Sequence, residues 1–88
     1  MSYNYETEKA WLFTDEGQRC LFKANENVRT LLEAAGAFVG FCALKNVSID
    51  DTWKMLAVID RLVELGAIRE VTSGVWAQDR VFVDGKRR

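Results

Sequence analysis

The stretch from Asp15 to Ala35 constrains the fold more than any other part of the sequence. Its apolar residues recur three or four positions apart, which is the spacing of one buried helical face. Thr14 precedes it as a residue that can cap a helix, and Gly36 follows it as a helix stop. The sequence therefore predicts one long helix, with inward positions at Leu21, Ala24, Val28, Leu31, Leu32 and Ala35.

Shorter elements are predicted on both sides of this helix. Residues 5–13 fit a short first helix, with Tyr5, Trp11 and Leu12 facing inward. Residues 37–44 are apolar all round, which predicts either a short second helix or an apolar bridge. A helix in a small domain needs only one buried stripe, so the other apolar face of this segment must be covered as well. Either the N-terminal helix or a partner protein covers it.

A further helix is predicted after residue 48. Ser48-Ile49-Asp50-Asp51 has the S-x-x-[DE] pattern of a capping box, and Gly66 ends the helix that this pattern opens. The inward face of this helix consists of Met55, Leu56, Ile59, Leu62 and Val63.

The hydrophobic period changes after Gly66 from that of a helix to that of strands. Residues 67–71 and 75–83 predict two strands, and Thr72-Ser73-Gly74 is the natural place for the turn between them. In the second strand, Arg80 and Phe82 are expected on one face and the two flanking valines on the other. Residues 84–88 predict a polar tail.

Length and hydropathy limit the class of protein. A chain of 88 residues allows a single domain, residues 1–88, and leaves no room for a second. The longest uncharged apolar run, residues 34–44, covers eleven positions, whereas a membrane span needs about 20. The N-terminus has neither the basic nor the apolar region of a signal peptide. We therefore expect a cytoplasmic protein with no membrane partner.

The missing residue types exclude most enzyme chemistry. The chain has no histidine, and its two cysteines, Cys20 and Cys42, are too few for a self-contained structural zinc site. It also lacks a glycine-rich phosphate loop and a nucleophile elbow. We expect no catalytic residue, metal, cofactor or small-molecule substrate. Apolar neighbours predict that both cysteines are buried reduced thiols, with a disulfide as the alternative.

The charge is distributed unevenly along the chain. The whole sequence has 12 basic and 13 acidic residues, but its last three residues are Lys86, Arg87 and Arg88. Without them the body has 9 basic and 13 acidic residues, a net charge of -4. A mildly acidic body argues against an obligate nucleic-acid binder, whose surface usually has a basic excess.

The order of the predicted elements resembles that of a winged helix-turn-helix domain. The resemblance depends on the segment Ile59 to Ile68, which contains "L-V-E-L-G-A-I", followed by Arg69-Glu70-Val71 and the hairpin. It covers residues 15–83 and extends to small bacterial proteins of unassigned function with a final "Q-D-R-V-F-V" strand. The resemblance implies an α+β fold with a three-helix core, an extra N-terminal helix and a C-terminal β-hairpin wing. Winged helices serve as DNA readers and equally as protein-binding or dimerisation modules.

In the resemblance, residues 50–65 correspond to the helix that reads DNA. Its outer face is expected to show Trp53, Lys54, Ala57, Asp60, Arg61 and Glu64. Between Asp50 and Glu64 there are four acids and two bases, a local charge of -2 that would oppose phosphates. Nucleic-acid contact therefore depends on Lys54 and Arg61 on this helix and on basic residues that cluster on the presumed wing and tail: Arg69, Arg80, Lys86, Arg87 and Arg88.

Aromatic side chains favour a protein partner instead. Three tryptophans are many for a chain of this length, and aromatic residues on exposed faces are enriched at interface hot spots. The candidate interface residues are Phe38, Phe41, Trp53, Ala57 and Trp76. The sequence thus predicts a non-enzymatic regulatory or adaptor module that acts through protein–protein contact, either with another protein or as a homodimer through residues 34–44. A regulator that binds duplex DNA through its wing and basic tail is the alternative.

Overall fold

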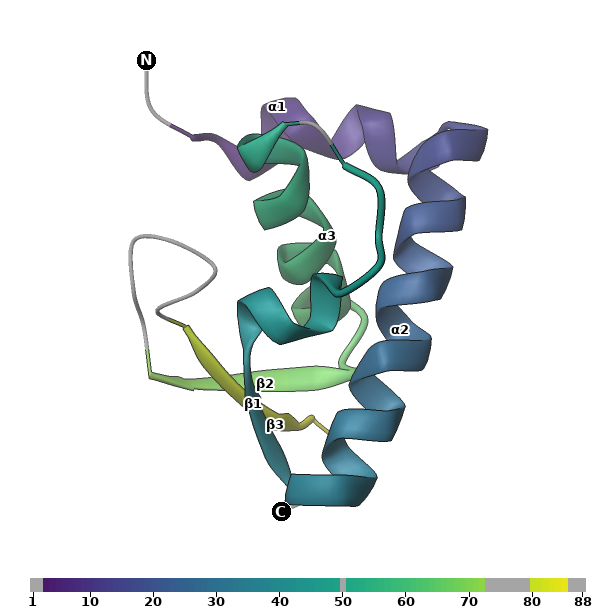
Figure 1. Ribbon diagram of the computed structural model, residues 1–88. Coiled ribbons are helices and arrows are strands. Elements are labelled where there is room, and N and C mark those ends of the chain that lie inside the picture. Colours follow the sequence, from purple (N-terminus) through teal and green to yellow (C-terminus); the bar gives the residue numbers. More distant parts are fainter. Residues whose placement is uncertain (1–2, 50, 73–79, 86–88) are drawn as a thin grey trace.

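The computed structural model describes residues 3–49, 51–72 and 80–85, which form an α+β structure of helices and an antiparallel sheet (Figure 1). The predicted turn after Thr72, the first part of the predicted second strand, Trp76 and the basic residues 86–88 lie outside the described residues. In chain order the elements are α1 (Tyr5–Glu8), the 3-10 helix η1 (Lys9–Phe13), α2 (Asp15–Ala35), β1 (Ala37–Val39), the 3-10 helix η2 (Gly40–Leu44), α3 (Thr52–Glu64), β2 (Ile68–Thr72) and β3 (Val81–Asp84).

Helix α2 begins and ends where the sequence predicts. The Thr14 side chain accepts a hydrogen bond from the backbone N–H of Gly17 at 3.1 Å, which caps the N-terminus. Gly36 adopts a left-handed conformation with φ of 78° and donates its N–H to the Leu32 carbonyl at 2.9 Å. Leu21, Ala24 and Val28 are buried, as the apolar period predicts, but Ala35 is exposed.

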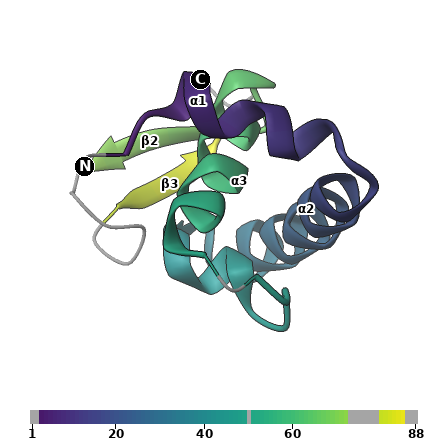
Figure 2. The same cartoon turned by 90° about the horizontal axis from the view of Figure 1, so that it is seen from above.

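The predicted first helix is divided into α1 and η1, which together cross over α3 before the chain enters α2 (Figures 1 and 2). Leu12 is fully buried, and Tyr5 and Trp11 pack against the core. The turn into α2 is tightly bonded, because the Gln18 side chain donates to the Leu12 carbonyl at 2.6 Å. This segment, residues 3–13, is called the N-terminal segment below.

Residues 37–44 form strand β1 and then η2, so the prediction of a short helix is wrong for residues 37–39. β1 pairs with β3, which lies between β1 and β2 in the antiparallel sheet. Phe38 is opposite Phe82, and their rings stack with centroids 5.7 Å apart. The left-handed turn at Gly36 redirects the chain to β3, where the backbone groups of β1 find hydrogen-bond partners.

Helix α3 begins later than the capping-box pattern predicts. Asp51 is the cap, because its side chain accepts a hydrogen bond from the N–H of Trp53 at 2.8 Å. Ser48 lies ahead of the helix, and its carbonyl accepts a hydrogen bond from the Cys20 thiol. The end of the helix is as predicted, with Gly66 in a left-handed conformation at φ of 79°.

The sheet lies against the helices through one face. Phe82 is fully buried and its flanking valines are partly exposed, which confirms the predicted alternation along β3. Asp84 belongs to β3, so the strand continues one residue beyond the predicted end at Val83. Phe38, Ile68 and Phe82 join the buried residues of α2 and α3 in one hydrophobic cluster.

Candidate functional site

The N-terminal segment covers the outer face of α3, which the sequence predicts to be exposed (Figure 2). Ala57, a predicted interface residue, is fully buried, so this prediction is wrong. Trp53 and Lys54 are only partly exposed. The cause is a long-range contact, because α1 and η1 both pack against α3 from a distant part of the chain.

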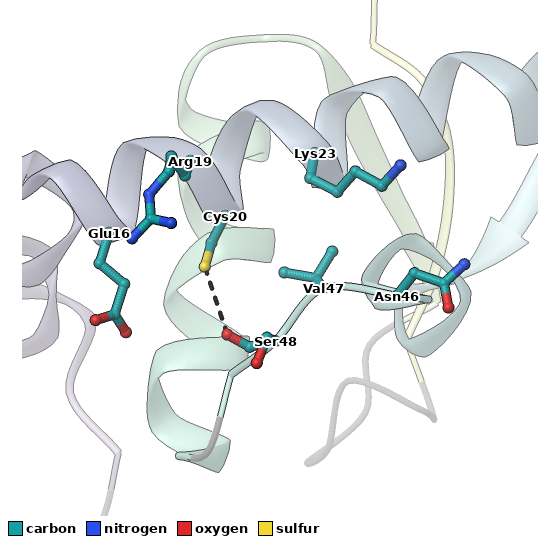
Figure 3. A pocket seen from close by; sticks show the side chains of 7 residues that line it. All are labelled: Glu16, Arg19, Cys20, Lys23, Asn46, Val47 and Ser48. Atoms are coloured by element: carbon teal, nitrogen blue, oxygen red, sulfur yellow. Dashed lines mark hydrogen bonds between the residues drawn. The ribbon is translucent and has the colours of Figure 1, made fainter.

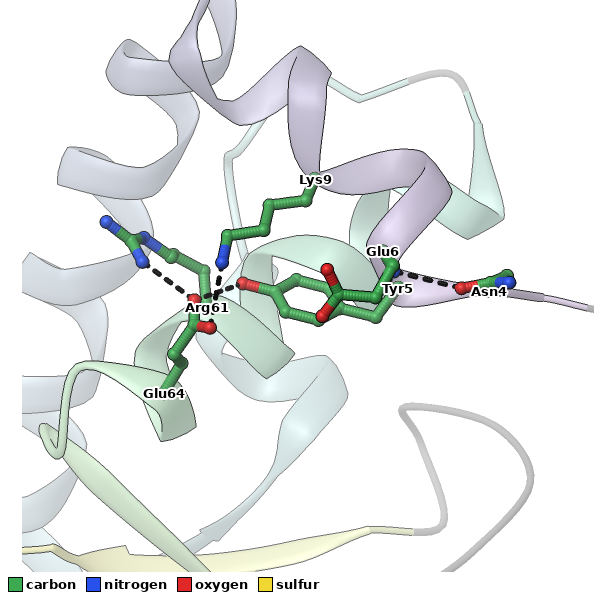
Figure 4. Close-up of polar contacts among 6 residues, drawn as sticks. All are labelled: Asn4, Tyr5, Glu6, Lys9, Arg61 and Glu64. Atoms are coloured by element: carbon green, nitrogen blue, oxygen red, sulfur yellow. Dashed lines mark hydrogen bonds and ion pairs between the residues drawn. The ribbon is translucent and has the colours of Figure 1, made fainter.

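Glu64 is the centre of a polar cluster that fastens the N-terminal segment to α3 (Figure 4). Its carboxylate accepts hydrogen bonds from the Tyr5 hydroxyl at 2.7 Å, Lys9 Nζ at 2.9 Å and Arg61 Nη1 at 2.7 Å. These three donors stabilise the ionised form and lower the pKa of Glu64 to about 2. Desolvation and the bond to Glu64 raise the pKa of Tyr5, so its hydroxyl remains a donor.

A second polar cluster joins the N-terminal segment, α3 and the two C-terminal strands. Asp60 accepts a hydrogen bond from the Tyr3 hydroxyl at 2.6 Å and another from Arg80 Nη2 at 2.7 Å. Arg80 also binds both carboxylate oxygens of Glu70, through Nε at 2.9 Å and Nη2 at 3.0 Å. The Arg80 side chain is only 12% exposed, so this predicted nucleic-acid residue is committed to two internal carboxylates.

The other predicted basic contacts are divided between internal and exposed positions. Lys54 Nζ lies 5.2 Å from the ring centroid of Trp11, and the Arg61 guanidinium lies 5.3 Å from that of Phe13. Arg69 is exposed on β2. Lys86, Arg87 and Arg88 lie outside the described residues. The structure therefore does not bring the predicted basic residues together on one open surface among the residues that it describes.

The predicted protein-interface residues are not brought together either. Phe38 is buried against Phe82, so its assignment to an interface is wrong, and the register of β1 is the reason. Phe41 on η2 is 57% exposed. Trp76 lies outside the described residues.

An apolar surface that the sequence reasoning missed lies between α2 and the end of α3. Phe13, Phe22 and Leu65 are 60%, 68% and 54% exposed, which makes them three of the most exposed large apolar side chains in the described chain. Phe22 and Leu65 border a hollow of about 350 Å³, whereas Phe13 is not among its lining residues and lies against Arg61. We call this surface the α2–α3 hollow, and it is lined by Gln18, Leu21, Phe22, Asn25, Leu62, Leu65 and Ala67.

One signal in the sequence could have indicated this surface. Adjacent helical residues point about 100° apart, so the predicted inward position of Leu21 leaves Phe22 on the outward side. A phenylalanine on the outward side of a capped, amphipathic helix has no intramolecular role in the predicted fold.

A second hollow, of about 400 Å³, lies between α2 and residues 46–48 and contains Cys20 (Figure 3). The Cys20 thiol donates to the Ser48 carbonyl at 3.8 Å, and burial raises its pKa, which disfavours the reactive thiolate. The Lys23 amine points away from the thiol. This hollow therefore does not support thiol chemistry.

Both cysteines are free, as predicted, but Cys42 is exposed and the prediction that it is buried is wrong. Cys42 lies on the outward side of η2, directly before the buried residues Ala43 and Leu44. No group of three or more Cys, Asp or Glu residues suited to a metal ion occurs within residues 3–49, 51–72 and 80–85.

Comparison with known proteins gives no relative from which a function could be inferred. No known protein family, curated protein or solved structure matched the chain. Within the described part of the chain, no helix has the length and apolar character needed to cross a membrane.

Proposed function

We propose that this protein is a non-catalytic, winged-helix-like module that acts through protein–protein contact, with the α2–α3 hollow as its binding surface. The observation that carries the proposal is the exposure of Phe22 and Leu65 around one hollow. Contiguous apolar surfaces of this kind mark binding sites on soluble proteins. The resemblance to winged-helix domains and the capped helix followed by antiparallel strands support the fold assignment.

The exposed apolar side chains of this surface favour a partner. A small domain needs its large apolar residues in the core, yet this chain leaves Phe22 and Leu65 outside it. Covering the exposed parts of these two side chains contributes roughly 2–4 kcal/mol. Association itself costs roughly 4–15 kcal/mol, so the hollow anchors a partner whose remaining contacts come from the rim.

The same observations weigh against the DNA alternative. The outer face of α3 is covered by the N-terminal segment, and its charges at Asp60, Arg61 and Glu64 have internal partners. Groove reading needs an open face with free donors. In the DNA alternative, exposed Arg69 and the basic C-terminal residues contact the phosphates of the duplex. Such contacts weaken as the salt concentration rises.

The binding surface can be tested with two matched phenylalanine variants. Phe22→Gln removes the aromatic anchor of the hollow, whereas Phe41→Gln changes a phenylalanine of similar exposure on η2. Each variant and the wild-type chain are immobilised, and the proteins retained from a lysate of expressing cells are identified by mass spectrometry. We expect Phe22→Gln to lose at least one species that Phe41→Gln retains. Identical sets of retained proteins for both variants and the wild type, from a chain that also stays monomeric at about 1 mM, would overturn the proposal.

A titration with duplex DNA decides the alternative. We expect amide shifts, if they occur, only around Arg69 and residues 80–88, and we expect them to vanish between low and moderate salt. Shifts along residues 53–64 that survive moderate salt would show that α3 reads DNA and would contradict the proposal.

A further inference from the structure

We propose that the partner of the α2–α3 hollow is a second copy of this chain, bound about a twofold axis that passes beside Phe22. The two copies of α2 lie antiparallel across this axis. The inference rests on the proposed function, because it names the partner of the same surface.

The outward stripe of α2 has a charge order that suits this arrangement. Asp15, Phe22 and Arg29 are seven positions apart, so they lie within about 40° of one another around the helix axis. All three side chains are exposed. The stripe therefore carries an acid one heptad before the phenylalanine and a base one heptad after it.

A twofold axis at Phe22 makes this stripe complementary to itself. In an antiparallel pair centred on residue 22, Asp15 lies opposite Arg29 of the partner subunit, and the symmetry repeats the pair at the other end. Neither Asp15 nor Arg29 makes an ion pair with any residue in the part of the chain that the structure describes. Both charges are therefore available to a partner.

Other arrangements of α2 lack this match. A parallel pair would place Asp15 opposite Asp15 of the partner subunit and Arg29 opposite Arg29 of the partner subunit, which is repulsive at both ends. A partner of a single sign of charge would be attracted at one end and repelled at the other. The antiparallel second copy satisfies both ends with the same stripe.

The hollow provides the apolar centre of this interface. Phe22 stands at its rim, so the axis brings Phe22 of the partner subunit against Phe22 and Leu65, above a floor that includes Leu21 and Leu62. Paired aromatic rings add about 0.5–1.5 kcal/mol to the burial of their area. A contact limited to one helix face and one hollow is small, so we expect a dissociation constant in the micromolar to millimolar range.

Sedimentation equilibrium between about 10 µM and 1 mM measures this association, and charge-swap variants test its geometry. We expect wild-type dimers, loss of dimerisation in Phe22→Gln, and at least about tenfold weakening in Asp15→Arg and in Arg29→Asp, since each swap makes two pairs repulsive. The double variant Asp15→Arg/Arg29→Asp should recover the wild-type affinity. Arg69→Asp, at an exposed position of β2, is the control and should leave the dimer unchanged. Circular dichroism confirms that each variant is folded.

The outcomes separate this inference from the proposed function. A wild-type chain that stays monomeric at about 1 mM overturns the second copy as partner, and a lysate protein retained only when Phe22 is present then keeps the proposed function. The antiparallel arrangement is overturned if the single charge swaps leave the dissociation constant of the dimer unchanged. It is also overturned if the double swap does not restore the wild-type dissociation constant. If the chain stays monomeric and Phe22→Gln retains the same lysate proteins as the wild type, both the dimer and the proposed function are wrong.

Discussion

Gly17 allows a close approach between α2 and the N-terminal segment. A Cβ atom at this position would lie 2.2 Å from the Trp11 carbonyl oxygen and 2.7 Å from the Leu12 Cα. Both neighbours are backbone atoms, and Leu12 is fully buried, so the backbone cannot retreat without disturbing the core. Packing therefore requires a glycine at position 17, although glycine is unfavourable within a helix.

We predict that Gly17→Ala destabilises the protein by about 2–3 kcal/mol, because overpacking a tight contact has costs of this size. Helix propensity alone predicts the opposite effect, an increase of about 1 kcal/mol in the free energy of unfolding. Urea unfolding measures the difference. Gly36→Ala is the control: open space surrounds Gly36, and its positive φ makes alanine cost only about 1 kcal/mol. A Gly17→Ala variant as stable as the wild type would show that η1 does not pack against α2 in this way.

Single residues were predictable from the sequence where their role is local. Thr14 and Gly36 interact with backbone groups within four positions, so the motif alone identifies them. Ala57 and Phe38 were not, because the segments that bury them come from distant parts of the chain. Phe22 lay between these cases, since its outward direction followed from the helix but its exposure depended on what the fold leaves uncovered.

At the scale of elements, the start of α3 shows the limit of motif reasoning. The S-x-x-[DE] pattern at Ser48 is satisfied in sequence, yet the chain passes Ser48 without entering a helix. Val47 and Ile49 are partly buried against the core, which holds this stretch away from helical geometry. Asp51, the last residue of the pattern, becomes the cap instead.

The position of the cap can be tested by paired alanine substitutions. Asp51→Ala removes the acceptor for the Trp53 N–H and should destabilise the protein by about 1 kcal/mol. Ser48→Ala removes an exposed hydroxyl and should change the free energy of unfolding by less than about 0.5 kcal/mol. Chemical denaturation of both variants gives the comparison. The reverse order of effects would place the cap at Ser48.

Strand β1 was the element least accessible to sequence reasoning. A short apolar run is compatible with a strand or a helix, because periodicity cannot separate the two over so few residues. The choice was made by pairing with β3, whose Phe82 lies opposite Phe38. Helix α2 was predictable because its twenty-one residues repeat one local period between two caps.

At the scale of the whole molecule, a charged helix face is covered within the fold while large apolar side chains are left exposed. The charged outer face of α3 is bonded internally, to the N-terminal segment and to Arg80. Large apolar residues around the α2–α3 hollow are left exposed instead. The predicted acidic character of α3 was therefore a sign of intramolecular pairing, which composition alone could not distinguish from a surface that repels DNA.

Acid should weaken the contact between the N-terminal segment and α3. Glu64 has its pKa lowered from the ordinary 4.5 to about 2 by Tyr5, Lys9 and Arg61, so the folded state binds a proton less readily than the unfolded chain. This stabilisation is complete above about pH 5 and is lost as the pH falls from about 4.5 to about 2.

Urea unfolding at several pH values, with the side-chain carboxyl of Glu64 followed by NMR, measures this loss. We expect the free energy of unfolding of Glu64→Gln to fall less steeply than that of the wild type across this interval, because glutamine cannot take up the proton. Glu33→Gln, which changes an exposed carboxylate on α2, should keep the wild-type slope. Parallel curves for Glu64→Gln and the wild type would mean that the Tyr5 and Lys9 bonds to Glu64 do not hold the N-terminal segment in solution.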